Sequence, residues 1–69
     1  MIDLVAIEMR LARIRYLAKI QGDNGAAHSA EKALWQDVLE AIAEKAADPE
    51  LLARAALKTE EISFTRWYE

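Results

Sequence analysis

The stretch IDLVAIEMRLARIRYLAKIQGDNG, residues 2–25, decides the fold of this 69-residue chain. Its apolar residues recur at alternate steps of three and four, which is the spacing of one face of an α-helix, and Asp3 is a suitable N-cap. We therefore predict a helix over residues 3–20. The cluster Gly22-Asp23-Asn24-Gly25 that follows combines residue types that favour turns, and it predicts the bend of a helical hairpin.

The predicted first helix carries two apolar stripes, although a helix in a small monomer needs one. The first stripe consists of Leu4, Ile7, Leu11, Ile14 and Ala18, and the second of Ile2, Val5, Met9, Ala12 and Tyr16. At about 100° per residue the stripes point to well-separated sides of the helix. One stripe is expected to face the chain's own second helix and the other a partner protein or a second copy, and the sequence leaves open which does which.

The rest of the chain predicts two more helices. The second helix is expected from residue 26, or from 29 with Ser29 as its N-cap, to residue 46, with an apolar face of Trp35, Val38, Leu39, Ile42 and Ala46. Asp48-Pro49-Glu50 combines an N-cap, a proline at the first helical position and a carboxylate in the first turn, so a short third helix should begin there and end near Lys58. The tail, residues 59–69, carries Ile62, Phe64, Trp67 and Tyr68 and is expected to pack on the helices. The predicted fold class is all-α: one domain over residues 1–69, an antiparallel helical hairpin with a short third helix and a packed aromatic tail.

Length and composition favour a homodimer. A core in a chain of this size rarely supplies more than about 3–5 kcal/mol of stability, and without cysteine no disulfide adds to it. Oligomerisation is the remaining common supplement, and we expect it to use one stripe of the first helix. No apolar run approaches the roughly 20 residues of a membrane span, and no signal-peptide pattern is present at the start, so a cytoplasmic protein without membrane contact is expected.

Charge is distributed unevenly along the chain. Residues 1–20 carry four basic and two acidic side chains, whereas residues 21–69 carry five basic and ten acidic ones, for a net charge of −3. An acidic chain is poorly suited to neutralising phosphates. In a helix-turn-helix protein the second helix of a close pair reads the DNA, and here the later helices are acidic. Nucleic-acid binding is therefore not expected.

Residues with catalytic or metal-binding potential do not form a recognisable set. His28 has no second histidine or cysteine to join it, so it is expected at the edge of the core, and Glu40 and Glu44, with Asp37 nearby, are expected to form a solvated helix face. Phosphate-binding loops and nucleophile motifs are missing from the sequence. We expect neither an enzyme nor a cofactor or metal site.

Aromatic side chains and arginines are the best candidates for contact with a partner, because both are enriched among the residues that dominate binding energy. The candidates for partner binding or for a dimer interface are Val5, Met9, Arg10, Arg13, Tyr16, Trp35, Trp67 and Tyr68. The competing interpretation places Trp35 in the core and leaves the arginines at positions 10, 13 and 15 solvated on the surface or paired with Glu31, Glu40 or Glu44.

The segment ALKTEEISFTRW, residues 56–67, resembles the ending of small proteins from the early regions of Mu-like transposable phages. Within that group, the length, acidity and helical-hairpin character are similar to those of an anti-activator that inhibits the quorum-sensing transcriptional activator LasR and the pilus assembly ATPase PilB. The resemblance implies a homodimeric protein that binds host proteins in the bacterial cytoplasm and blocks them. It assigns no contact residue.

The expected function is thus stoichiometric inhibition of a host protein by occlusion of a surface that the target needs. Two alternatives stay open at this point. A small dimeric DNA-binding regulator would need a basic face assembled from both copies, and a structural adaptor would act inside a larger complex.

Overall fold

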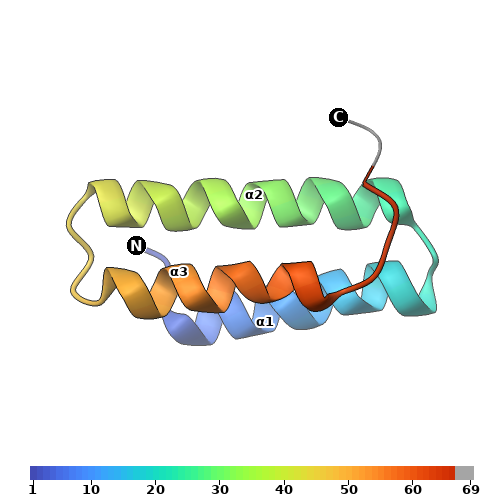
Figure 1. The fold of residues 1–69 in the computed structure, drawn as a ribbon, viewed down its shortest axis with the longest axis horizontal. Helices are drawn as coiled ribbons and strands as arrows, with labels where there is room; N and C mark the ends of the chain where they lie inside the picture. The colour runs from blue at the N-terminus through green and yellow to red at the C-terminus, as the bar shows by residue number, and fades with distance from the viewer. Residues whose placement is uncertain (67–69) are drawn as a thin grey trace.

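The computed structural model describes residues 1–66, and this part of the chain is a bundle of three α-helices without β-strands (Figure 1). Helix α1 spans Leu4–Arg15 and continues as a π-helical segment, η1, over Tyr16–Ile20. Helix α2 spans Asn24–Ala43, and α3 spans Pro49–Leu57 and ends in a 3₁₀ turn, η2, over Lys58–Glu61. The predicted all-α hairpin with a short third helix is confirmed, and each helix packs on both others.

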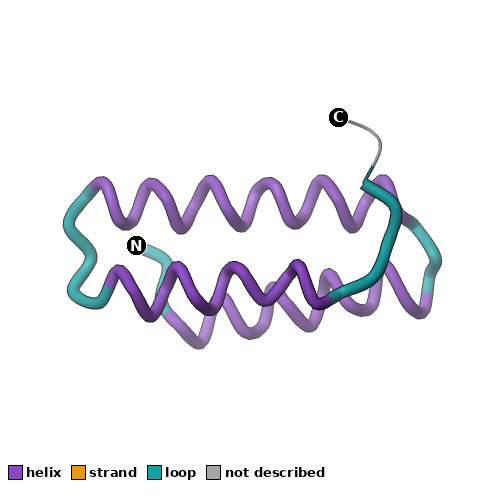
Figure 2. The backbone as a smooth tube through the Cα atoms, viewed as in Figure 1, coloured by secondary structure: helices purple, strands orange, loops and turns teal. Residues whose placement is uncertain are grey.

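Short loops join the helices, and a longer strap follows them. Figure 2 shows the connections at the two ends of the bundle and the extended segment after η2, which crosses back to the N-terminal part of α2. This segment, residues 62–66, is named the strap below. Its Ile62 is buried and Phe64 packs partly on the core. The packed aromatic tail as a whole stays a prediction. Trp67 and Tyr68 lie outside the described residues.

The bend between the first two helices differs from the prediction. Asn24 and Gly25 are the first residues of α2, because Asp23 caps that helix by accepting a hydrogen bond from the Ala26 amide at 3.0 Å. The bend lies at Gly22, the first residue of the predicted cluster, whose φ of +62° is a conformation that glycine adopts without a steric penalty. The prediction of a cap at Ser29 was therefore wrong. The prediction for Asp3 is confirmed, since its carboxylate accepts from the Ala6 amide at 2.9 Å.

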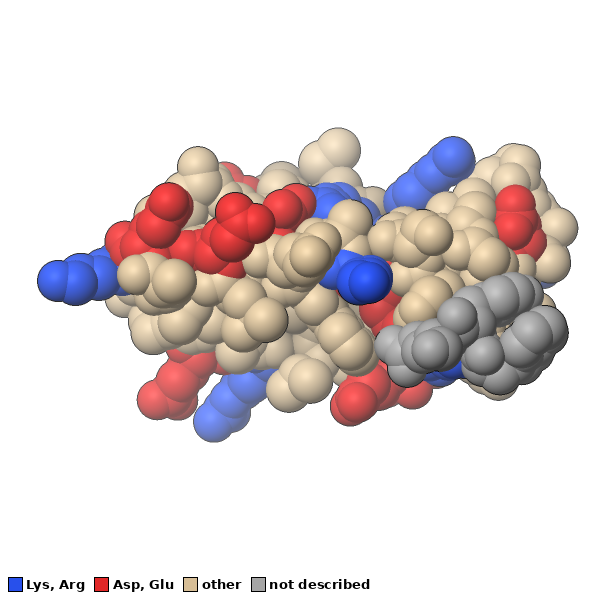
Figure 3. Space-filling view, turned by 90° about the horizontal axis from the view of Figure 1, so that it is seen from above, with Lys and Arg blue, Asp and Glu red and all other residues tan. Residues whose placement is uncertain are grey.

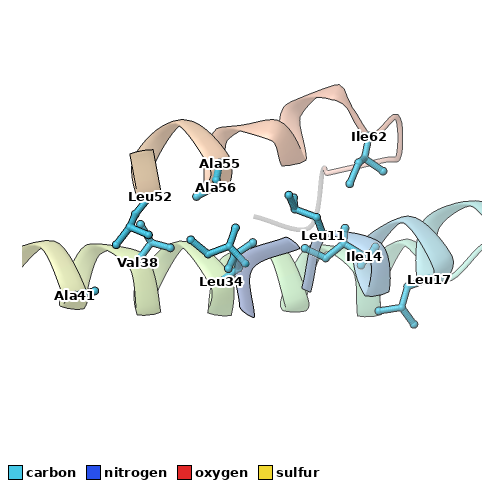
Figure 4. Close-up of a cluster of buried hydrophobic side chains, with 12 residues drawn as sticks. Leu11, Ile14, Leu17, Leu34, Val38, Ala41, Leu52, Ala55, Ala56 and Ile62 are labelled. Atoms are coloured by element: carbon cyan, nitrogen blue, oxygen red, sulfur yellow. The ribbon is translucent and has the colours of Figure 1, made fainter. Parts of the chain in front are cut away.

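The core lies between the three helices (Figure 4). Its buried apolar residues are Ile7, Leu11, Ile14, Leu17, Ala27, Leu34, Val38, Ala41, Leu52, Ala55, Ala56 and Ile62. The first stripe of α1 is thus intramolecular. At its end Leu17 is buried in place of the expected Ala18, because the wider π-helical turn rotates the following residues relative to an α-helix.

The apolar face predicted for the second helix is confirmed for Val38, which is buried, and for Trp35, Ile42 and Ala46, which pack partly on the core, but not for Leu39. Leu34 is fully buried, whereas Leu39, which was expected in the core, is 65% exposed. The buried stripe of this helix also contains Glu31, and a charged residue at that position hides the stripe from a hydrophobic pattern. Helix α2 also ends earlier than expected, at Ala43, followed by Lys45 in a left-handed conformation.

Candidate protein-docking surface

The second stripe of α1 lies on the outside of the bundle. Val5 and Met9 are each 68% exposed, Tyr16 is 41% exposed, and Ala12 between them is also exposed. These four residues are named the α1 outer face. They lie opposite the buried stripe because the two sets are separated by about half a turn of the helix. Ile2, at the start of the predicted stripe, instead packs partly against the core.

The two arginines named as candidate partner contacts lie in different surroundings. Arg13 belongs to the outer face, since its guanidinium lies 5.6 Å from the centre of the Tyr16 ring. Arg10 instead forms an ion pair with Asp37 of α2. The expected partners of the arginines, Glu31, Glu40 and Glu44, were therefore wrong for Arg10. Its pairing with Asp37 joins α1 to α2 and leaves less of its charge available to a ligand.

Trp35 lies away from the α1 outer face, between α2 and α3. It is half-buried, and its indole Nε1–H donates to the Ala56 carbonyl oxygen at 3.2 Å and to the Thr59 hydroxyl at 3.1 Å. The structure thus separates Trp35 from Val5, Met9 and Tyr16, with which the sequence had grouped it. Its role within the chain is to connect α2 to the end of α3.

An apolar groove runs between α2 and α3, on the side of the bundle opposite α1. The groove is lined by Trp35, Val38, Leu39, Ile42, Ala53, Ala56 and Leu57. Among the lining residues, the side chains of Leu39 and Leu57 are the most accessible to solvent, at 65% and 53% exposed. Sequence reasoning missed this groove because it placed Leu39 in the core, although the stripe that continues from Trp35 through Leu39 to Ile42 was visible.

Acidic side chains collect beside this groove rather than in it. Figure 3 looks down on α2 and shows carboxylates gathered toward the C-terminal end of that helix, where Asp37, Glu40 and Glu44 are exposed. Helix α2 therefore has an acidic side, towards α1, and a side towards α3 on which Trp35, Leu39 and Ile42 line the groove. The sequence predicted this solvated acidic face correctly.

The most deeply buried charged residue is Glu31, which is 1% exposed. Arg66 of the strap donates from Nε and Nη2 to its carboxylate at 3.0–3.2 Å, and Nη2 donates further to the backbone oxygens of Thr59 and Ile62. Burial raises the pKa of Glu31, but hydrogen bonds from Arg66 and Thr59 and the positive charges of Arg66 and His28 outweigh it, so this pKa lies below its ordinary value. Because the carboxylate is covered and fully engaged, its role is to fasten the strap.

His28 lies at the edge of the core, as expected, with Nδ1 3.8 Å from Oε1 of Glu31. Across residues 1–66, no three His, Cys, Asp or Glu side chains are arranged to hold a metal ion. In the same part of the chain, none of the helices combines the length and apolar character that crossing a bilayer requires.

Two features of the described surface therefore stand out: the α1 outer face and the groove between α2 and α3. Comparisons with models of protein families, with curated proteins and with solved structures find no match for this chain. What the chain does must be inferred from these two surfaces.

Proposed function

We propose that this chain is a protein-interaction module that binds another protein through the α1 outer face and blocks the surface it covers. The observation that carries the proposal is the joint exposure of Val5, Met9 and Tyr16 on a helix whose opposite stripe is buried at its centre, at Ile7, Leu11 and Ile14. An apolar stripe on the first helix is not needed to hold this bundle together. Apolar surface with an aromatic residue, left in water beside arginine, is typical of a binding face.

The charge around this face indicates the chemistry of the partner. Arg13 packs over Tyr16, Arg15 is exposed nearby, and Glu8 is the acidic residue of the same helix. The complementary surface is an apolar patch with a carboxylate rim. Such charges orient the partners and speed their encounter more than they add affinity.

The mechanism that this surface supports is occlusion. A rigid helix that covers a site on its target needs no turnover and no cofactor, and it acts at a ratio of one face to one target. Following the resemblance of the C-terminal segment to phage early-region proteins, we propose a host protein in the bacterial cytoplasm as the target. The quorum-sensing activator LasR and the pilus ATPase PilB are the first candidates to test.

The experiment is capture from bacterial lysate with the tagged full chain, followed by mass spectrometry and by titration calorimetry with purified LasR and PilB. Met9→Glu should abolish capture of the target, because a carboxylate at the centre of the face would be desolvated without a partner. Leu39→Glu is the matched control, since Leu39 is equally exposed on the opposite side of the bundle and should leave capture unchanged.

Two results would overturn this proposal. One is that Met9→Glu captures the same protein as the natural chain while Leu39→Glu does not, which would move the target to the other surface. The other is that the chain retains only nucleic acid, with binding that falls steeply as salt is added, which would favour the DNA-binding alternative.

A further inference from the structure

The groove between α2 and α3 can be covered without leaving a polar group unpaired. Its lining is apolar apart from the Trp35 indole N–H, and that donor is already bonded to Ala56 and Thr59. Covering such a surface removes Leu39 and Leu57 from water at no hydrogen-bonding cost. Interfaces of this dry kind are typical of permanent association rather than of transient encounter.

Charge at the two ends of the groove favours a second copy as its occupant. Lys32 lies seven residues before Leu39 on α2, and Glu50 lies seven residues before Leu57 on α3, so each is in line with an exposed leucine. Helices α2 and α3 run antiparallel (Figure 1). Because Lys32 precedes the first groove residue of α2, Trp35, and Glu50 precedes the first of α3, Ala53, the two charges lie at opposite ends of the groove. Both side chains are exposed. Glu50 also forms an ion pair with Arg54, one turn further along α3, in which Nη2 of Arg54 lies 3.7 Å from Oε2 of Glu50.

The α1 outer face is a poorer surface for self-association. Two copies packed there in parallel, about a two-fold axis along the helix, would bring Arg13 and Arg15 of one copy close to the same arginines of the other, and like charges at an interface disfavour that pairing. The charge pattern therefore assigns the two surfaces to different partners.

We infer that this chain forms a homodimer through the groove between α2 and α3. The two-fold axis lies in the interface, perpendicular to the helices. It places the Lys32 end of each copy next to the Glu50 end of the other, so the dimer contains two such pairs of opposite charge. Leu39 and Leu57 of each copy then fill the groove of its partner. The dimer carries its two α1 outer faces on opposite sides, so it is bivalent for the target; this last point rests on the proposed function, whereas the interface does not.

The first test is the mass of the full chain in solution, measured by light scattering and sedimentation at several concentrations. The natural chain should be a dimer, and Leu39→Glu and Leu57→Glu should both be folded monomers, with helical circular dichroism retained because neither leucine is in the core. Met9→Glu is the matched control and should stay dimeric. A monomeric natural chain, or a dimer that Met9→Glu dissociates and Leu39→Glu does not, would overturn the inference.

A charge exchange tests the two-fold arrangement itself. Lys32→Glu and Glu50→Lys should each weaken self-association by roughly tenfold at low salt, because each makes both ends of the interface carry like charges. Mixed in equal amounts, the two variants should form a heterodimer in which every pair is again opposite in charge. A mixture that associates no better than its components would overturn this arrangement. Target capture by Leu39→Glu is scored separately, so loss of the dimer and loss of target binding are distinguished.

Discussion

The ion pair between Glu31 and Arg66 helps to hold the strap to the bundle. Glu31 is almost completely removed from water, and its carboxylate is bonded by Arg66, whose guanidinium also lies 3.8 Å from the centre of the Phe64 ring. Burying a carboxylate is unfavourable by itself, so the pair contributes specificity more than net stability. Removing one partner should therefore lower the free energy of unfolding by more than the intact pair adds to it.

Arg66→Ala should lower the free energy of unfolding by about 2–3 kcal/mol, because it leaves the Glu31 carboxylate buried without its main partner. The matched control is Arg54→Ala, which removes an arginine from the exposed pair with Glu50 and should cost about 0.5 kcal/mol or less. Urea unfolding followed by circular dichroism measures both. Equal losses in the two variants would contradict the role given to Glu31.

The lowered pKa of Glu31 makes this contribution depend on pH. A carboxyl whose pKa is lower in the folded than in the unfolded chain stabilises the fold above its ordinary value of 4.5, and this stabilisation is lost as the pH falls through the folded value. Glu31→Gln should therefore differ most from the natural chain near neutral pH, and the difference should shrink below about pH 4.5. Urea midpoints measured between pH 7 and pH 3 test this. A difference that is constant with pH would show that the charge of Glu31 is not responsible.

At the scale of helices, capping is the clearest test of local structure. Asp23 accepts a hydrogen bond from the first turn of α2, whereas the side chain of Asp48 makes no such bond to α3. Asp23→Ala should therefore cost about 1 kcal/mol of stability, and Asp48→Ala less, since only its charge at the helix N-terminus is lost. Thermal unfolding of the two variants measures the difference. A larger loss for Asp48→Ala would mean that the sequence motif, and not the observed bond, sets the cap.

The start of α3 and the stripe of α1 could be predicted from local signals, because Asp48-Pro49 and the spacing of Ile7, Leu11 and Ile14 depend only on neighbouring residues. The buried face of α2 could not be predicted completely in this way. Glu31 is in the core because of Arg66, which lies 35 residues away, and no local pattern carries that pairing. The second half of the predicted bend was wrong for a local reason: Asn-Gly favours turns, but Asp23 caps α2 and the helix begins at Asn24.

For the whole molecule, the sequence predicted exposed apolar surface, but it located only one of the two surfaces, the α1 outer face. The α1 outer face follows from helical periodicity alone. The groove appears only when α3 is placed against α2, because its walls come from residues such as Leu39 and Leu57 that are separated by a loop and a helix end. Among the candidates named from sequence, the structure sets Val5, Met9, Arg13 and Tyr16 on one side of the bundle and Trp35 on the other.

The two stripes of α1 differ in what they contribute, and one substitution in each separates them. Leu11 is 2% exposed at the centre of the bundle, so Leu11→Glu buries a charge without a partner and opens the core. The cost should exceed the about 3–5 kcal/mol that a core of this size supplies, and the variant should be unfolded. Met9→Glu, two residues away on the same helix, should keep its helical circular dichroism. Its free energy of unfolding should stay within about 0.5 kcal/mol of the natural chain, because exposed substitutions rarely cost more. If Met9→Glu unfolded the chain and Leu11→Glu did not, the outer stripe would be the structural one, and both the proposed docking face and the placement of the core would have to be exchanged.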